Sequence, residues 1–281
     1  MFYDFNCSTR AGREYNEDAI FYNHDFMIVI DATTSLTNVN RTDEKTEGCW
    51  LSKKAISFLS SCFTDKNISI PEALHLASDL LKKQLNSAEN SHADLAYPSA
   101  SIMIARDLND KIELFSIGDC TALIKLSGHA GERVIHDDSV TKLDNSILDL
   151  LAEKHKTTGI SVDELLPSVK DLLIANRKKM NRKDGYWIFD PTGEAIQNGT
   201  HLLFPKKAVE SIALMSDGFY CITSINPDYD SKNLTKALET TPADELIDYI
   251  FHEYENDAHL NKFPRFKLKD DASVVFAKIK I

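Results

Sequence analysis

Three aspartates, each at one end of an apolar run, are the residues of this sequence best suited to chemistry. Such runs are typical of buried strands, and a sheet would bring their acidic ends together. Because unpaired buried carboxylates repel one another and lose hydration, their clustering predicts a bound cation. Oxygen ligands favour Mg²⁺ or Mn²⁺ over zinc. The aspartates are Asp31 after residues 26–30, Asp217 after residues 212–216, and Asp270 before residues 272–276.

Further charged residues lie in predicted turns. Arg13, Glu17 and Asp18 fall between two short strands expected over residues 2–6 and 20–22, and this loop could present the arginine to a ligand. Taken alone, the segment fits a solvated charged turn equally well. Asp119 follows Gly118 between two strand-like runs, and by itself it fits a turn residue better than a site residue.

Composition limits the classes of partner. The chain has 281 residues and a net charge of −11, which argues against nucleic acid or an anionic membrane surface as a partner. An acidic chain can still handle phosphate once metal charge is included. Its five cysteines form no C-x-x-C pair, and no long apolar run or basic leader is present. We therefore expect a soluble, reduced, cytoplasmic protein without zinc.

Helices and strands alternate in blocks along the chain. Apolar spacing predicts helices over residues 47–60 and 70–85, the second with Ser69 as its N-cap and Pro71 in its first turn. Residues 99–106, 111–117 and 121–126 alternate and predict an antiparallel meander.

The second half of the chain begins with an irregular section. Residues 128–200 form a predicted flap-like insertion, with helical parts at 146–151 and 162–180 and a strand at 185–189. Its basic run, residues 177–183, fits a solvated face, or alternatively a surface that meets a phosphorylated substrate. A strand ending at Asp217, helices over 234–239 and 242–255, and a last strand over 272–281 complete one predicted domain, residues 1–281.

Six short motifs occur in an order and at spacings that resemble the PP2C (PPM) family of metal-dependent serine/threonine protein phosphatases, of the bacterial type. The resemblance covers nearly the whole chain. It implies an α+β fold, a four-layer α/β/β/α sandwich in which helices flank two antiparallel sheets. The motifs are Gly12-Arg13 with Asn16-Glu17-Asp18-Ala19, Val29-Ile30-Asp31-Ala32, Pro98-Ser99-Ala100-Ser101, Gly118-Asp119-Cys120, Met215-Ser216-Asp217-Gly218 and Asp270-Asp271-Ala272-Ser273-Val274.

The resemblance implies a binuclear Mn²⁺ or Mg²⁺ centre. Asp31 would bridge the two ions, the backbone carbonyl of Ala32 would bind one of them, and Asp217 and Asp270 would complete the ligand set. Two ions about 3.5–4 Å apart can activate a bridging water for in-line attack at phosphorus.

The resemblance also implies roles for three residues of the loop between the first two predicted strands. Glu17 and Asp18 would hold metal-bound waters, and Arg13 would bind the substrate phosphate, where a planar guanidinium fits two oxygens better than an ammonium does.

Three positions depart from the family pattern. Ala32 stands where relatives have glycine, and Thr33 where eukaryotic members have histidine. A third metal site in many relatives uses the aspartate matched here by Asp119 together with a second aspartate, which is replaced by Cys221. Because a thiol is a poor ligand for a hard ion, we expect two ions and a doubtful third site.

The function implied is hydrolysis of phosphoserine and phosphothreonine in proteins, with Arg13, Asp31, Asp217 and Asp270 as the catalytic set. The partners would be a phosphoprotein and a serine/threonine kinase system. Two alternatives stay open: a catalytically weak regulatory or binding module that keeps the fold, and a phosphohydrolase of small molecules that uses the same site.

Overall fold

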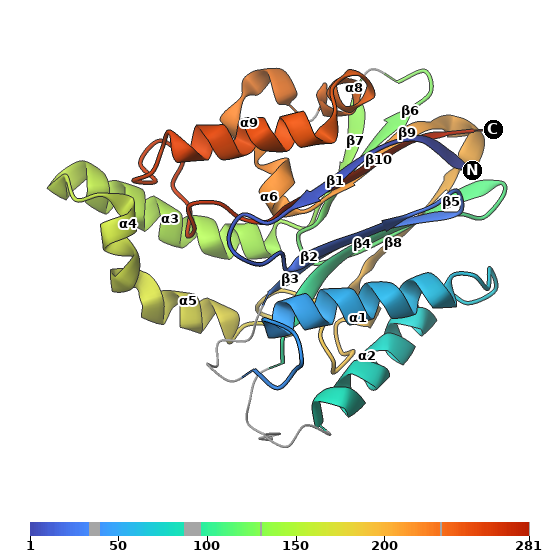
Figure 1. Cartoon of the computed structure of the whole chain (residues 1–281), viewed down its shortest axis with the longest axis horizontal. Helices are drawn as coiled ribbons and strands as arrows, with labels where there is room; N and C mark the ends of the chain where they lie inside the picture. Colours follow the sequence, from blue (N-terminus) through green and yellow to red (C-terminus); the bar gives the residue numbers. More distant parts are fainter. Residues whose placement is uncertain (34–39, 87–96, 130, 231, 281) are drawn as a thin grey trace.

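The computed structural model describes residues 1–33, 40–86, 97–129, 131–230 and 232–280. Two antiparallel five-stranded sheets stack face to face (Figure 1). One, the β10 sheet, has the order β1 (Phe2–Arg10), β10 (Ala272–Ile279), β9 (Val209–Met215), β6 (Thr121–Leu126) and β7 (Glu132–Ile135). The other, the β3 sheet, has the order β2 (Asp18–Tyr22), β3 (Phe26–Thr33), β4 (Ser99–Asp107), β5 (Lys111–Ile117) and β8 (Thr200–Pro205).

Helices cover both outer faces, which confirms the predicted α/β/β/α sandwich. Helices α1 (Glu47–Cys62) and α2 (Ile70–Asn86) pack on the β3 sheet. On the β10 sheet lie α6 (Asp217–Tyr220), α7 (Ile222–Ile225), α8 (Leu234–Thr240) and α9 (Ala243–Glu255). At one end of the sandwich, α3 (Ser139–Thr158), α4 (Val162–Leu165) and α5 (Lys170–Arg177) project beyond the sheets (Figure 1).

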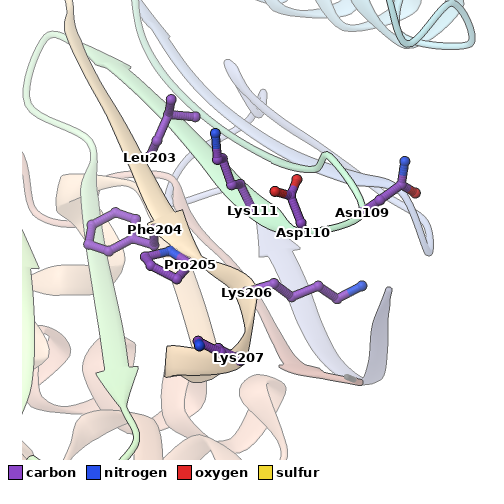
Figure 2. A pocket seen from close by; sticks show the side chains of 8 residues that line it. All are labelled: Asn109, Asp110, Lys111, Leu203, Phe204, Pro205, Lys206 and Lys207. Atoms are coloured by element: carbon purple, nitrogen blue, oxygen red, sulfur yellow. The ribbon is translucent and has the colours of Figure 1, made fainter.

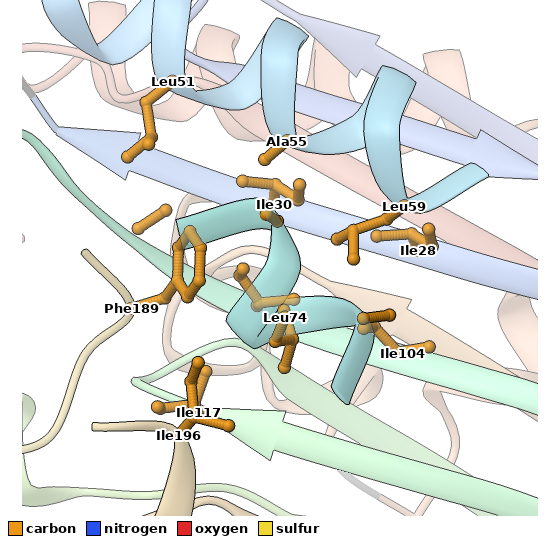
Figure 3. Packing of buried hydrophobic residues seen from close by; sticks show 14 of the residues in the cluster. Ile28, Ile30, Leu51, Ala55, Leu59, Leu74, Ile104, Ile117, Phe189 and Ile196 are labelled. Atoms are coloured by element: carbon orange, nitrogen blue, oxygen red, sulfur yellow. The ribbon is translucent and has the colours of Figure 1, made fainter. Parts of the chain in front are cut away.

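Alternation along β3 decides which way each side chain points. Met27 and Val29 are buried between the sheets, whereas Ile28 and Ile30 pack against the helices. Figure 3 shows those two isoleucines beside the α1 side chains. Burial of each such side chain contributes about 1.5–3 kcal/mol. Asp31 continues the series of Met27 and Val29, so its position in the strand directs it between the sheets.

The predicted helix starts are confirmed for the first two helices. Thr46 caps α1, where its hydroxyl accepts a hydrogen bond from the backbone N–H of Cys49 (3.0 Å). The Ser69 hydroxyl accepts from the N–H of Glu72 (3.3 Å), and Pro71 lies in the first turn of α2.

The predicted meander is wrong at its third strand. Strand β4 pairs with β5, but β6 pairs with β9 and β7 in the other sheet. Gly118, in the left-handed conformation (φ 81°), turns the chain out of the β3 sheet at this point. The residues after it therefore cross from one sheet to the other.

The insertion also differs from the prediction. Residues 185–189 form no strand: Phe189 makes a single bridge to Ala100 and is buried in the core beneath the helices, and Pro191 soon follows. The helix expected over 162–180 breaks into α4, a 3₁₀ turn and α5, because Pro167 cannot continue an α-helix. The helix expected over 146–151 runs from 139 to 158, the last strand ends at 279, and strands β7 and β8 were not predicted.

Candidate active site

Five aspartates line one pocket of about 600 Å³ at the end of the sandwich that carries α3 and α5. They come from segments far apart in the chain. Asp31 lies near the end of β3, Asp119 links β5 to β6, Asp144 is in α3, Asp217 begins α6 directly after β9, and Asp270 precedes β10.

Asp31 has the most crowded environment. Burial raises its pKa well above the usual value, and the charges of Asp18 and Asp217 raise it further. Asp18 is the partner of Asp31 across β2 and β3. Its Oδ2 atom is buried and has no hydrogen-bond partner in the described part of the chain. A buried carboxylate oxygen without a hydrogen-bond partner is stabilised by a proton or a cation.

Asp217 lines the same pocket as Asp31 and also has a raised pKa. Surrounding protein raises the pKa to about 7, first by desolvation and then through the charges of Asp270 and Asp119. The Asp217 side chain is nevertheless exposed to the water of the open pocket, so we give more weight to the carboxylate repulsion than to desolvation. A cation between these carboxylates would remove their repulsion.

Asp119 is fixed by Ser101 from the adjacent strand. The Ser101 hydroxyl donates to Oδ1 of Asp119 (2.5 Å) and accepts from its backbone N–H (3.1 Å). A Cβ atom on Gly118 would lie 2.3 Å from that hydroxyl, so the contact needs glycine. Burial raises the pKa of Asp119, and the Ser101 hydrogen bond opposes the rise.

Asp270 is paired with a lysine. The Lys267 ammonium lies 2.7 Å from Oδ1 and 2.9 Å from Oδ2 of Asp270, with both side chains partly exposed. A metal ion at Asp270 would share the carboxylate with Lys267 or displace it.

Ala32 lies within β3 opposite Ala100, and it is not among the non-glycine residues with positive φ. The strand conformation there needs no glycine, so alanine is compatible with the local backbone. Its role as a carbonyl ligand stays a prediction.

The loop before β2 is held by Asp271. Its two carboxylate oxygens accept hydrogen bonds from the backbone N–H groups of Gly12 (2.8 Å) and Glu17 (2.7 Å). The Glu17 carboxylate itself accepts from the Thr46 hydroxyl (2.6 Å). Arg13 is exposed. Arg13, Glu17 and Asp18 are not among the residues that line the pocket, so their predicted roles stay predictions.

Residues 14–262 match the model of the family described as Protein phosphatase 2C. The chain belongs to the protein phosphatase 2C family. No curated protein sequence matches it significantly.

Solved structures similar to this PP2C chain include bacterial phosphatases. They include the Mycobacterium tuberculosis serine/threonine phosphatase PstP/Ppp (16% identity, all of both chains covered, TM-score 0.60). The catalytic domain of PstP in complex with two manganese ions is another (15% identity, 99% of this chain and 98% of that one, TM-score 0.57). A third is Stp1 of Staphylococcus aureus (15% identity, 99% and 95% covered, TM-score 0.55). At these identities the likeness shows the fold.

The pocket of this PP2C chain has a second wall that the sequence did not reveal. Asp144 and Arg177 come from the insertion, and His136, whose Nδ1 lies 2.9 Å from the Thr121 hydroxyl, precedes α3. Burial, and then the Asp217 charge, raise the pKa of Asp144 to about 6. The sequence pattern predicts no strand end or turn at Asp144 or His136. For Arg177 the only signal was its place at the start of the basic run.

Cys221 and Cys7 do not have the chemistry of a metal ligand or a nucleophile. Burial raises the pKa of Cys221 to about 12, and its thiol donates to the Gly218 carbonyl (3.2 Å). Cys7 and Arg13 have the C-x₅-R spacing of cysteine-dependent phosphatases. However, burial raises the pKa of Cys7 to about 12 and its thiol contacts the Phe276 carbonyl, so it is not a thiolate.

A second pocket, of about 560 Å³, lies at the opposite end of β5 (Figure 2). That end is about 20 Å from Asp119, given the rise per residue of a strand. Of the described residues that line it, Asp110 is the one carboxylate, beside Lys111, Lys206 and Lys207, so the described lining offers no comparable set of oxygen ligands. Lys206 is itself paired with Asp107 (2.6 Å).

The donor set of the first pocket fits a hard divalent cation. In the described part of the chain, no three His, Cys, Asp or Glu side chains are already arranged around one point as metal ligands. The repulsion among these buried carboxylates and the unpartnered Asp18 oxygen are nevertheless what a cation would relieve and satisfy. Also in the described residues, no helix has the length and apolar character needed to cross a membrane.

Proposed function

We propose that this chain hydrolyses phosphoserine and phosphothreonine in proteins, with two Mn²⁺ or Mg²⁺ ions. Membership of the PP2C family supports a serine/threonine phosphatase. The observation that carries the proposal is the convergence of five aspartates from both sheets and the insertion on one pocket. The raised pKa values of Asp31 and Asp217 support it further, because these carboxylates repel one another without a cation.

In this proposal Asp31, Asp217, Asp270 and the Ala32 carbonyl would hold the two ions. Bound there, the ions would lower the pKa of water and neutralise charge on the phosphoryl group. The residues themselves must first change state. Any protons that Asp31 and Asp217 hold because of their raised pKa values would be released, and Lys267 would share or release Asp270.

Residues around the ligands would position water and substrate. Asp18, beside Asp31 on the neighbouring strand, has a free oxygen able to accept from a water. Glu17 holds the start of α1 through Thr46, and Arg13 projects to solvent from the same loop, where an incoming phosphate would meet it. We further infer that a serine/threonine kinase produces the substrate and that the protein acts in the cytoplasm.

The proposal is tested with purified protein, Mn²⁺ and a phosphoserine peptide. We expect phosphate release that EDTA abolishes and that Asp217→Asn reduces about 1,000-fold, because the ions supply several kcal/mol of transition-state stabilisation. The matched control is Asp149→Asn, an exposed residue of α3. Absence of hydrolysis, or unchanged activity in Asp217→Asn, would reject the proposal. Mn²⁺ binding by calorimetry without turnover would then favour a regulatory module, and turnover of small phosphate esters only would favour the small-molecule enzyme.

A further inference from the structure

Arg177 is the last residue of α5 and the first of the basic run, and it lines the carboxylate pocket. It is half-buried. Its Nη1 donates to the Ser99 hydroxyl (3.1 Å) and its Nη2 to the Thr33 hydroxyl (2.9 Å). Thr33 and Ser99 are paired across β3 and β4, two residues beyond the pair of Asp31 and Ser101. The guanidinium therefore lies over the strand ends that carry the predicted bridging ligand.

The insertion also fixes Arg177 from its other side. The neighbouring Asn176 donates to the Leu143 carbonyl of α3 (3.1 Å), which ties the two helices together beside the pocket. Burial raises the pKa of Tyr186, which also lines the pocket, and the Arg177 charge opposes this rise. Contacts on several sides restrict the rotamers of this long side chain, so little entropy is lost when it binds a ligand.

Other cations near the pocket have carboxylate partners. Arg265 pairs with Asp257 (2.7 Å) and also donates to the Tyr254 carbonyl (3.0 Å). Lys267 pairs with Asp270. Arg177 has hydroxyl partners, and the described residues place no carboxylate within ion-pair distance of it. Since a guanidinium has five N–H donors, donors and a full charge remain available.

We propose that Arg177 binds the phosphoryl oxygens of the substrate, as the residue that the insertion contributes to the phosphatase site. This inference rests on the proposed function. A phosphomonoester dianion that enters a pocket lined by five aspartates needs positive charge from the protein as well as from metal ions. A planar guanidinium matches two phosphoryl oxygens. Arg13, predicted for this role, is exposed outside the pocket lining, whereas Arg177 lies within it.

The test compares Arg177→Gln, Arg177→Lys and Arg177→Ala with Lys178→Ala, an exposed control in the same run. Glutamine can still donate to Ser99 or Thr33 but carries no charge, which separates phosphate binding from an anchoring role. With a phosphoserine peptide and saturating Mn²⁺, we expect KM to rise about 10- to 100-fold in the glutamine and alanine variants, the range of a lost charged hydrogen bond. Lysine should restore part of the loss, and Lys178→Ala should leave KM within about twofold.

The second measurement needs no turnover. Inorganic phosphate is titrated into each Mn²⁺-loaded protein by calorimetry, and we expect its affinity to fall in parallel with KM while Mn²⁺ affinity and the thermal midpoint stay unchanged. Wild-type KM and phosphate affinity in Arg177→Gln would overturn the inference. So would a loss in kcat alone, which indicates positioning rather than binding.

Failure of the proposed function gives a different result from failure of this inference. If wild-type protein hydrolyses no phosphoester, the proposed function fails, and loss of phosphate binding in Arg177→Gln would still support Arg177. If wild-type protein binds no phosphate either, both are rejected. Should Arg177→Ala not fold, the glutamine and lysine variants decide the outcome.

Discussion

The two walls of the pocket are built differently. The wall of sheet ends carries Asp31, Asp119, Asp217 and Asp270, and continuous strand pairing fixes it. Helices of the insertion form the other wall. α3 buries only Ile147 and Leu151 of its described residues, and α5 buries none. A rigid wall suits groups that need close mutual geometry, whereas a loosely buried wall can change without loss of the core. We therefore assign the chemistry to the sheet ends and recognition to the helices.

The largest expected effect on kcat comes from the same change, aspartate to asparagine, made once in each wall of the pocket. Asp31→Asn should lower kcat about 1,000-fold, because it would replace the proposed central metal ligand, whereas Asp144→Asn should lower it about tenfold or less. Both changes keep the side-chain shape. Steady-state rates with a phosphoserine peptide and Mn²⁺ measure the contrast, and equal losses in the two variants would remove the distinction between the walls.

Metal removal should also distinguish the two walls, by its effect on the stability of the folded protein. Because the folded-state pKa values of Asp217 and Asp144 are raised to about 7 and about 6, the metal-free fold holds protons that the unfolded chain releases near pH 4. Its stability should therefore fall as pH rises from about 4 through about 7. At pH 7.5, Mn²⁺ at 100 times its Kd should raise the free energy of unfolding by about 2.7 kcal/mol. The increase should be smaller at pH 5.5, where protons compete with Mn²⁺ for the carboxylates.

Thermal melts with Mn²⁺ or EDTA at the two pH values measure this effect. For a chain of this size the added stability corresponds to a rise in Tm of about 5 °C. Asp31→Asn should abolish most of the rise, and Asp144→Asn should keep it. A metal-free protein that is more stable at pH 7.5 than at pH 5.5 would contradict the carboxylate repulsion.

A smaller effect is expected at the loop that supports the sheet wall. Asp271→Asn loses one of two carboxylate contacts to backbone N–H groups, and we expect about 1 kcal/mol lower stability. Urea denaturation measures it. The exposed Asp79→Asn in α2 is the control and should stay within about 0.5 kcal/mol. Equal stability in both variants would mean that Asp271 does not hold the loop.

The difference between the walls also explains what the sequence could predict. A continuous apolar run bounded by an acid shows where a buried strand ends, so the strands delivering Asp31 and Asp217 were predictable. Residue types cannot show which sheet a strand joins, and the β5 to β6 crossing at Gly118 was missed for that reason. Tyr186, Ile188 and Phe189 looked like part of a strand because they are apolar, yet they are buried from an irregular segment that forms only isolated bridges in the described part of the chain.

Residues of the insertion were harder to predict for a physical reason. A charged side chain on a half-exposed helix has the same local pattern whether it meets water or a pocket. The position of Asp144 depends on how α3 docks at the end of the sandwich, which is a tertiary property. Only the charge density of the basic run pointed to Arg177, and it did not identify which of the basic residues enters the pocket.

The carboxylates are divided between the sheets: Asp18 and Asp31 belong to the β3 sheet, while Asp217 and Asp270 flank strands of the β10 sheet. Their repulsion therefore opposes the docking of one sheet on the other. A cation that binds all of them would cross-link the layers, and it can do so only after they have docked. We expect such a cation to act mainly on kinetics, by slowing unfolding while leaving the folding rate nearly unchanged.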